Sequence, residues 1–266
     1  TSGSRNWYKV KNIKTIIDRA VDEGIDITCD RYPYIAAATD LDVILPNWVY
    51  EGGIADQINR LKDTNTRQQI AKEVSQSEDN GFWNGIMISS VYYDKNKWME
   101  GKTITEISKE LNKPPIETVF DLLIEEETRV DIFLFSMCEE NLEKILGWDF
   151  VFVGSDSSMR ANQGILKEGK PHPRSYGTFS RILGRFYREK KLLSLEKAIQ
   201  KMTGLPAQKV GLNKRGLIKA GYFADITIFD PEKIIDRSTF TEPHQYSEGV
   251  EYVIVNGKIA VNNGKH

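Results

Sequence analysis

A carboxylate follows a continuous apolar run near the middle of the sequence. Residues 150–153 read FVFV, and Asp156 comes after Gly154 and Ser155. If this run is a strand of a βα barrel, its carboxyl end lies at the rim where such folds place reactive groups. A half-desolvated aspartate there could ligate a metal or exchange a proton with a metal-bound water. The alternative is an aspartate that caps a turn or the next helix.

Two further segments carry groups that could bind an anion. Tyr32 and Tyr34 flank Pro33 at the exit of a predicted strand. Their hydroxyls can donate hydrogen bonds to an anion, although aromatic packing is the commoner role. Arg174 lies in a polar loop before a predicted helix, where its guanidinium could hold a carboxylate through two hydrogen bonds or form a surface ion pair.

Other residue types that bind metals or act as nucleophiles are scarce. The sequence has 3 histidines and 2 cysteines: His172, His244, His266, Cys29 and Cys138. We expect the cysteines to be core thiols and the first two histidines to order loops. A complete multi-histidine metal site cannot be built from this sequence alone. Because phosphate-binding glycine loops, the Gly-x-Ser-x-Gly elbow and Cys-x-x-Cys pairs are absent, nucleotide binding and serine-hydrolase chemistry lack support.

Composition excludes several other classes of protein. The 266 residues include 36 Lys and Arg against 38 Asp and Glu, a net charge of −2, which argues against a nucleic-acid partner. A hydrophobic content of 40% excludes a mainly disordered chain. No apolar run approaches the roughly 20 residues of a membrane helix, so we expect no membrane association. Few cysteines and no signal peptide predict a cytoplasmic location.

The hydrophobic pattern alternates between helical and strand spacing. Helices are predicted at 13–21, 54–61, 103–111, 115–123, 142–146, 178–190 and 194–202. Strands are predicted at 25–29, 86–91, 131–135, 150–153, 224–229, 250–255 and 258–261. This alternation indicates βα units around a parallel sheet. Residues 35–102 form a long excursion, and Asn256-Gly257 predicts a type I′ hairpin in an antiparallel tail.

Taken together, the motifs resemble those of a known enzyme family. They are DRYPY at 30–34, GSD at 154–156, HPRSYGTF at 172–179, KMTGLPA at 201–207, GYFAD at 221–225, PHQYSEG at 243–249 and VNG at 255–257. In this order they resemble the N-acyl-D-amino-acid deacylase (D-aminoacylase) branch of the amidohydrolase superfamily. The resemblance covers nearly the whole chain from Asn6 onward.

The resemblance implies both a fold and an activity. The expected fold is α/β: residues 1–213 as the C-terminal part of a distorted (β/α)8 TIM barrel, with 35–102 as an inserted substrate-loop excursion, and 214–266 as a β-sandwich segment. The expected reaction is zinc-dependent hydrolysis of N-acyl-D-amino acids to a carboxylate and a D-amino acid. The resemblance makes Asp156 the general acid/base beside the metal. It makes Tyr32 and Arg174 the residues that hold the substrate α-carboxylate.

The departures from the family pattern carry expectations of their own. Ala38 stands where the family has a serine that contacts the carboxylate, and the loop from Asp156 to His172 is longer than usual. The family's His-x-His motif, bridging Cys and two further metal-binding histidines would precede Thr1, so we expect the C-terminal portion of a longer enzyme. Such a chain should bind zinc weakly, be inactive alone and self-associate. A cyclic-amide amidohydrolase (dihydroorotase- or hydantoinase-like) and a non-catalytic remnant remain as alternatives.

Overall fold

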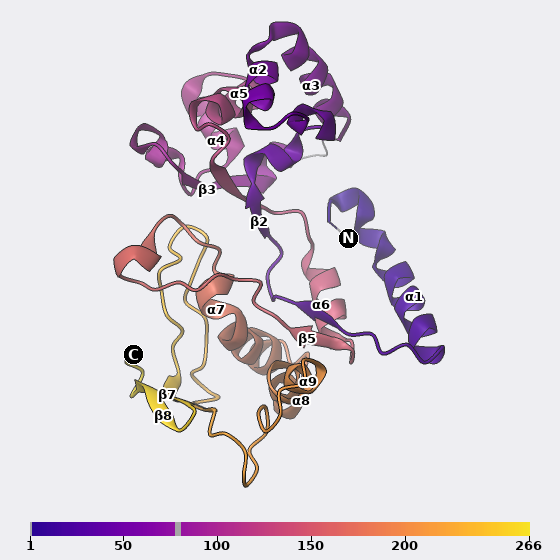
Figure 1. Ribbon diagram of the computed structural model, residues 1–266, viewed down its shortest axis with the longest axis vertical. Helices are drawn as coiled ribbons and strands as arrows, with labels where there is room; N and C mark the ends of the chain where they lie inside the picture. Colours follow the sequence, from indigo (N-terminus) through magenta and orange to yellow (C-terminus); the bar gives the residue numbers. More distant parts are fainter. Residues whose placement is uncertain (1, 78–80) are drawn as a thin grey trace. The chain divides into compact units, whose positions relative to one another are not determined.

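The computed structural model describes residues 2–77 and 81–266, which fold into two compact units (Figure 1). Unit 1 comprises the chain up to Ile35, Met137–Lys167 and Pro173–His266. Unit 2 comprises Ala36–Ser136 and Glu168–His172. Each unit therefore combines segments that are distant in the sequence.

Unit 1 contains a parallel strand pair, an antiparallel sheet and half of the helical elements. Its helical elements are η1 (Ser4–Lys9), α1 (Val10–Asp22), α6 (Glu139–Gly147), η6 (Gly164–Lys167), α7 (Arg174–Arg181), its π-helical continuation η7 (Ile182–Glu189), α8 (Leu195–Met202) and α9 (Gly204–Lys209). Its strands are β1 (Cys29–Arg31), β5 (Val151–Val153), β6 (Ile226–Phe229), β7 (Val250–Val255) and β8 (Lys258–Asn262). β1 pairs with β5 in parallel, whereas β6, β7 and β8 form an antiparallel sheet.

The core of unit 1 packs helices against the end of β5. Its buried members include Leu146 of α6, Val153 of β5, Phe186 of η7 and Ala198 of α8. Helix α8 begins where the sequence predicts, because the Ser194 hydroxyl accepts the Lys197 amide at 3.2 Å. This core holds the residues that follow β5 in a fixed place relative to α7.

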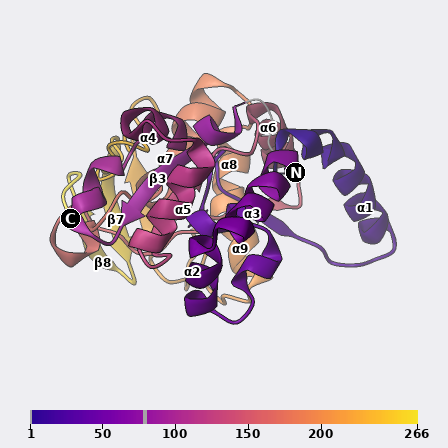
Figure 2. The ribbon, with the colours of Figure 1, turned by 90° about the horizontal axis from the view of Figure 1, so that it is seen from above.

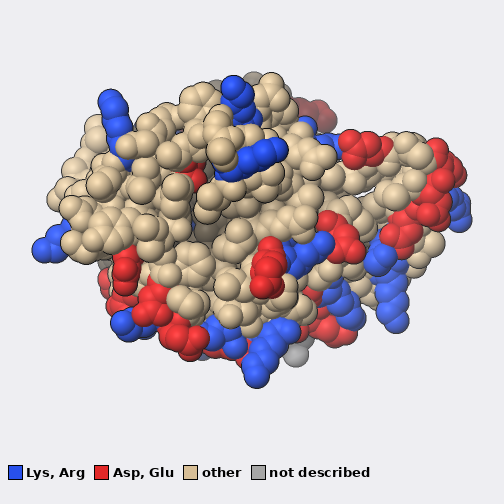
Figure 3. All heavy atoms as spheres, turned by 90° about the horizontal axis from the view of Figure 1, so that it is seen from below, with Lys and Arg blue, Asp and Glu red and all other residues tan. Residues whose placement is uncertain are grey.

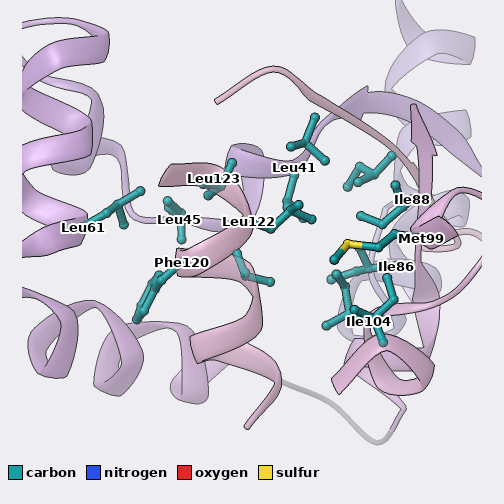
Figure 4. Packing of buried hydrophobic residues seen from close by; sticks show 14 of the residues in the cluster. Leu41, Leu45, Leu61, Ile86, Ile88, Met99, Ile104, Phe120, Leu122 and Leu123 are labelled. Carbon is teal, nitrogen blue, oxygen red and sulfur yellow. The ribbon is translucent and has the colours of Figure 1, made fainter. Parts of the chain in front are cut away.

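Unit 2 is an antiparallel sheet covered by helices. Its strands are β2 (Ala37–Asp40), β3 (Ile86–Val91) and β4 (Val130–Leu134), in the order β2-β4-β3. Its helical elements are η2 (Leu41–Ile44), η3 (Asn47–Tyr50), α2 (Ile54–Lys62), α3 (Thr64–Ser77), η4 (Phe82–Gly85), η5 (Asp94–Met99), α4 (Ile104–Leu111) and α5 (Pro115–Glu125). Figure 4 shows Leu41, Phe120 and Leu123 among the buried side chains of its core.

Several local predictions are confirmed. Thr103 and Glu106 form the capping box of α4, with the Thr103 hydroxyl accepting the Glu106 amide at 3.2 Å. Asn256 and Gly257 have φ of 51° and 76° between β7 and β8, as a type I′ turn requires. Strands were correctly predicted near 86–91, 131–135, 150–153, 224–229, 250–255 and 258–261.

Two strand predictions are wrong. Residues 25–28 carry no strand, because β1 begins at Cys29 and pairs through Arg31. The strand at 131–135, expected in the parallel sheet, pairs in antiparallel fashion with the 86–91 strand of the excursion, so within the described residues the parallel arrangement holds only for β1 and β5. The cause is that an apolar run reports burial, not the direction of its partner strand.

The division of the chain into a partial barrel over 1–213 and a sandwich over 214–266 stays a prediction. Unit 2 includes residues 36–102 of the expected excursion and continues through Ser136. The C-terminal strands form one three-stranded sheet with β6 at one edge and β8 at the other.

Helix α1 leaves most of its apolar stripe in solvent. Ile16 and Val21 are 68% and 46% exposed, and Val10 is the only residue of α1 that is buried. In the views of Figures 1 and 2, α1 projects away from the antiparallel sheet of its unit and is joined to β1 by residues 23–28. In the described ranges, no helix has both the length and the apolar character needed to cross a bilayer.

A buried lysine fixes the entrance to β5. Lys201 of α8 is fully buried, and its ammonium donates to the carbonyl of Trp148 and, at 2.8 Å, to that of Val151. Burial lowers the Lys201 pKa from 10.5 to about 8, since the charged form loses hydration that the two carbonyls only partly replace.

This lysine predicts a pH dependence of stability. Between the folded and unfolded pKa values, the unfolded chain holds the Lys201 proton and the folded chain releases it, so stability rises with pH across that window. We expect the free energy of unfolding of wild type, relative to Lys201→Met, to increase from about pH 7 to about pH 10. Denaturant titrations at each pH measure it. The exposed Lys144→Met is the control, and an equal slope in both comparisons would contradict the prediction.

Candidate functional site

The site begins with the parallel pairing of β1 and β5. Asp30 faces Phe152 in the register, so both strands end at the same edge, with Tyr32 after β1 and Asp156 after β5. Gly154 makes this close exit possible, because a Cβ there would lie 2.5 Å from the Asp30 carboxylate oxygen. The two predicted strand-end residues are therefore brought together by backbone pairing.

Helix α7 adds the third predicted residue. Its first residue, Arg174, places one guanidinium nitrogen (Nη1) 3.1 Å from Asp156 Oδ2. The Arg174 guanidinium carbon lies 4.7 Å from the centroid of the Tyr32 ring. The structure thus groups Asp156, Arg174 and Tyr32 within unit 1, while their roles in binding and catalysis stay predictions.

The expected half-desolvation of Asp156 is wrong. The Asp156 side chain is 67% exposed, whereas that of Arg174 is 10% exposed. The carboxylate stays in water because, in the part of the chain that is described, β5 has only β1 as a partner and no closed ring of strands surrounds its end.

Asp156 also has an unusual backbone. Its φ is +46°, in the left-handed region that costs most residues free energy and that Asp tolerates better than bulky residues. The backbone turns there as the chain leaves β5, and this turn aims the carboxylate at Arg174. The position therefore combines local strain with a polar contact, as functional positions commonly do.

The ring of Tyr32 lies near a second cation. The Arg31 guanidinium carbon is 4.3 Å from its centroid, and the same guanidinium donates to the Tyr34 carbonyl at 2.7 Å and to Met137 Sδ at 2.9 Å. Ser175 of α7 accepts a hydrogen bond from Ser157 at 2.6 Å, just after Asp156. Two guanidinium groups beside one phenol make this edge of unit 1 attractive to an anion.

Tyr34 is not part of the anion-facing group. It is 4% exposed, and its hydroxyl donates to Asp236 Oδ2 at 3.3 Å. Burial and the neighbouring carboxylate raise the pKa of Tyr34 above its ordinary value, so its hydroxyl stays a donor. Of the two phenols that the sequence singled out, Tyr32 is the one whose ring lies under the Arg174 guanidinium in the described part of the chain.

The histidines order loops, as expected. In unit 2, His172 is buried with Nε2 3.1 Å from the carbonyl oxygen of Ala36. In unit 1, His244 Nδ1 lies 3.0 Å from the hydroxyl of Tyr176, which donates to the carbonyl of Ala161 in the loop after Asp156.

The prediction of core thiols is wrong. Cys29 is exposed and Cys138 is only partly covered. Cys29 opens the short strand β1, where the described chain provides only β5 as a neighbour.

The residues present do not form a metal centre. Across residues 2–77 and 81–266, no three or more His, Cys, Asp or Glu side chains come together in a way that could hold a metal ion. Asp156 would be a single ligand, and its carboxylate is already engaged by Arg174. No chemical step through a metal is derived from these residues.

The sequence does not single out two residues that contact the Tyr32–Tyr34 segment of the candidate site. Arg181 and Asp236 form an ion pair at 3.0 Å that touches the Tyr32–Tyr34 segment from behind. They stand in segments with no shared motif, and their separation of 55 positions gives no local signal.

The surface charge agrees with the composition. On the face drawn in Figure 3, acidic and basic side chains lie next to one another and no large area carries one sign. An extended basic surface for nucleic acid is therefore not seen on this face.

The fold is of the α/β class and places polar side chains at the ends of the parallel pair β1 and β5. A family model described as "Amidohydrolase family" matches residues 84–261, which is more than half of the chain. The chain belongs to the amidohydrolase family.

The relatives identify the branch. N-acyl-D-glutamate deacylase of Alcaligenes xylosoxydans xylosoxydans is 31% identical over 252 residues, covering 95% of this chain and 42% of that protein. N-acyl-D-aspartate deacylase of the same organism is 44% identical over 124 residues, covering 47% of this chain and 24% of that protein. The resemblance to N-acyl-D-amino-acid deacylases is thereby confirmed. The chain spans less than half the length of these curated relatives.

A solved structure extends the likeness to the fold. It is N-acyl-D-glutamate deacylase from Bordetella bronchiseptica, complexed with zinc and a phosphonate inhibitor that mimics the tetrahedral intermediate. The TM-score is 0.72 at 27% sequence identity, covering 97% of this chain and 44% of that one.

The backbone of Asp156 generates a test of the turn after β5. Asp156→Gly and Asp156→Ala both remove the carboxylate, but only glycine adopts a positive φ without strain. We expect the glycine variant to be more stable by about 1 kcal/mol in denaturant unfolding. The same pair of substitutions at Ser157 should give the opposite order. Equal stability of the two Asp156 variants would contradict the strained turn.

Proposed function

We propose that this chain supplies the carboxylate-binding and proton-transfer groups of an N-acyl-D-amino-acid deacylase. The observation that supports the proposal best is the grouping of Asp156, Arg174 and Tyr32 after two parallel strands and at the start of α7. The named activities of the relatives support the reaction class, which is hydrolysis of the amide bond between an acyl group and the nitrogen of a D-amino acid.

Each of the three residues has a distinct role in the proposal. Arg174 binds the α-carboxylate of the substrate, because its side chain is only 10% exposed and its guanidinium carbon lies 4.7 Å from the Tyr32 centroid. Tyr32 donates its hydroxyl to the same carboxylate. Asp156 carries a proton toward the leaving nitrogen, since its carboxylate lies 3.1 Å from Arg174 and is 67% exposed, so that a ligand can reach it.

Zinc dependence is part of the proposal for the complete enzyme. The described residues offer too few ligands, so a zinc ion would need ligands from outside them. We therefore expect residues 1–266 by themselves to hydrolyse no N-acyl-D-amino acid, with or without added zinc.

Self-association and a cytoplasmic location complete the proposal. The uncovered side chains of α1, among them Ile13, Ile16 and Val21, favour association with a second molecule in water. Sedimentation velocity at increasing concentration tests this, and a concentration-independent monomer would refute it. The cytoplasmic location rests on the sequence alone.

The binding group can be tested without turnover. We expect the chain to bind N-acetyl-D-glutamate, followed by NMR titration, and Arg174→Met to weaken that binding about tenfold or more through loss of a charge-assisted hydrogen bond. Asp156→Asn should instead tighten binding, because it removes the anion that competes for Arg174.

The matched control is Arg129→Met in unit 2. Arg129 also stacks on a tyrosine, with its guanidinium carbon 3.6 Å from the Tyr92 centroid, and it lies outside the proposed site. Its loss should leave binding unchanged. Equal effects of the Arg174 and Arg129 variants would show that binding is non-specific, and hydantoin binding in place of the N-acyl-D-amino acid would favour the cyclic-amide alternative.

A further inference from the structure

A buried ion pair lies directly behind the proposed carboxylate-binding residues. Arg181, at the end of α7, contacts Asp236 through Nη1 and Oδ2 at 3.0 Å. The Asp236 side chain is 6% exposed and that of Arg181 is 22% exposed. Solvent screens this pair far less than it screens the pairs on the surface.

Both partners of the pair also bind the Tyr32–Tyr34 segment. Arg181 donates from Nε to the Pro33 carbonyl at 2.9 Å, and its guanidinium carbon lies 4.7 Å from the Tyr34 centroid. Asp236 accepts the Tyr34 hydroxyl at 3.3 Å. The residue directly after Tyr32 is therefore fixed through its backbone, and the next through its hydroxyl.

The same network reaches Arg174. The Tyr34 hydroxyl lies 3.5 Å from the carbonyl of Pro173, the residue that precedes Arg174. Arg174 and Arg181 stand about two turns apart on α7, so one rigid helix carries both. Movement of Arg181 away from Asp236 would shift both sides of the stacked pair formed by Tyr32 and Arg174.

The packing at this point leaves no room for adjustment. A Cβ on Gly177, in the middle of α7, would lie 2.6 Å from Asp236 Cβ and 2.6 Å from the Tyr34 hydroxyl oxygen. The absence of a side chain at Gly177 lets the C-terminal segment and the Tyr32–Tyr34 segment approach the helix together.

We propose that Arg181 and Asp236 are positioning residues that hold the Tyr32 ring against Arg174. This inference rests on the proposed function in one respect: the residues held in place are taken to form a preorganised carboxylate-binding site. The pair connects three segments, the loop after β1, helix α7 and the chain near Asp236, and the proposal assigns neither partner a contact with the ligand.

The test follows the Arg174 side chain by NMR. The Tyr32 ring current shifts the Nε–Hε resonance of a guanidinium stacked on it, and the signal is assigned by its loss in Arg174→Lys. We expect Asp236→Asn to move this resonance to the position of an unstacked arginine and to weaken N-acetyl-D-glutamate binding about tenfold. Glu248→Gln, in the exposed pair with Arg237, is the matched control and should change neither readout.

A second variant tests the inference without leaving an unpaired buried charge. Arg181→Met combined with Asp236→Leu removes both charges together, and such replacements commonly keep a protein folded. We expect a folded chain in which the Arg174 resonance has moved and binding is weakened. A folded variant with the wild-type resonance would overturn the positioning role.

The two proposals can fail separately. If the Arg174 resonance of wild type carries the ring-current shift of a stacked guanidinium but the protein does not bind N-acetyl-D-glutamate, the proposed function is contradicted and the positioning role stays intact. Variants of Asp236 that bind as wild type does and keep the resonance contradict the positioning role alone. Arg181→Lys keeps the charge but loses the bond to Pro33. An Arg174 resonance that lies between its wild-type position and its position in Asp236→Asn would support the positioning role.

Discussion

The parallel pairing of β1 with β5 is the constraint on which the candidate site depends. Backbone hydrogen bonds between the two short strands bring Asp30 opposite Phe152, so their exits lie side by side although they are far apart in the sequence. Lys201 holds the start of β5 through two carbonyls, and Gly154 keeps its end clear of Asp30. The direction of Asp156 therefore follows from the placement of β5.

The candidate site was predictable where its signals are local. Asp156 follows an apolar run and Arg174 opens a helix, so their types and positions could be inferred from the sequence. The unpredicted parts depend on distant contacts: Asp236 pairs with Arg181, and Cys29 is exposed because β1 has one neighbour among the strands that the structure describes. The exposure of Asp156 depends likewise on which strands stand around β5, and no local pattern encodes that.

The sequence predicts where most helices and strands lie, but it does not predict which strands pair or in which direction. The capping box of α4 and the Asn256-Gly257 hairpin depend on neighbouring residues and appear as expected. The strand at 131–135 is located correctly but is expected in a parallel sheet, because its buried run of apolar residues looks the same in either arrangement. Helical segments between strands reinforced that error, since α4 and α5 serve here to cover an antiparallel sheet.

The two arginines of α7 differ in a way that suits them to different tasks. Arg174 pairs with a carboxylate that is 67% exposed, so Asp156 can leave the pair with little change in its own hydration, and in the proposed site an incoming carboxylate would replace it. Arg181 pairs with a carboxylate that is 6% exposed, and separating such partners leaves a charge without compensation. One helix thus presents an exchangeable cation at its first residue and a fixed cation at its last. In the proposed site, an exchangeable Arg174 would also free Asp156 when a substrate binds, which is when a proton carrier would be needed.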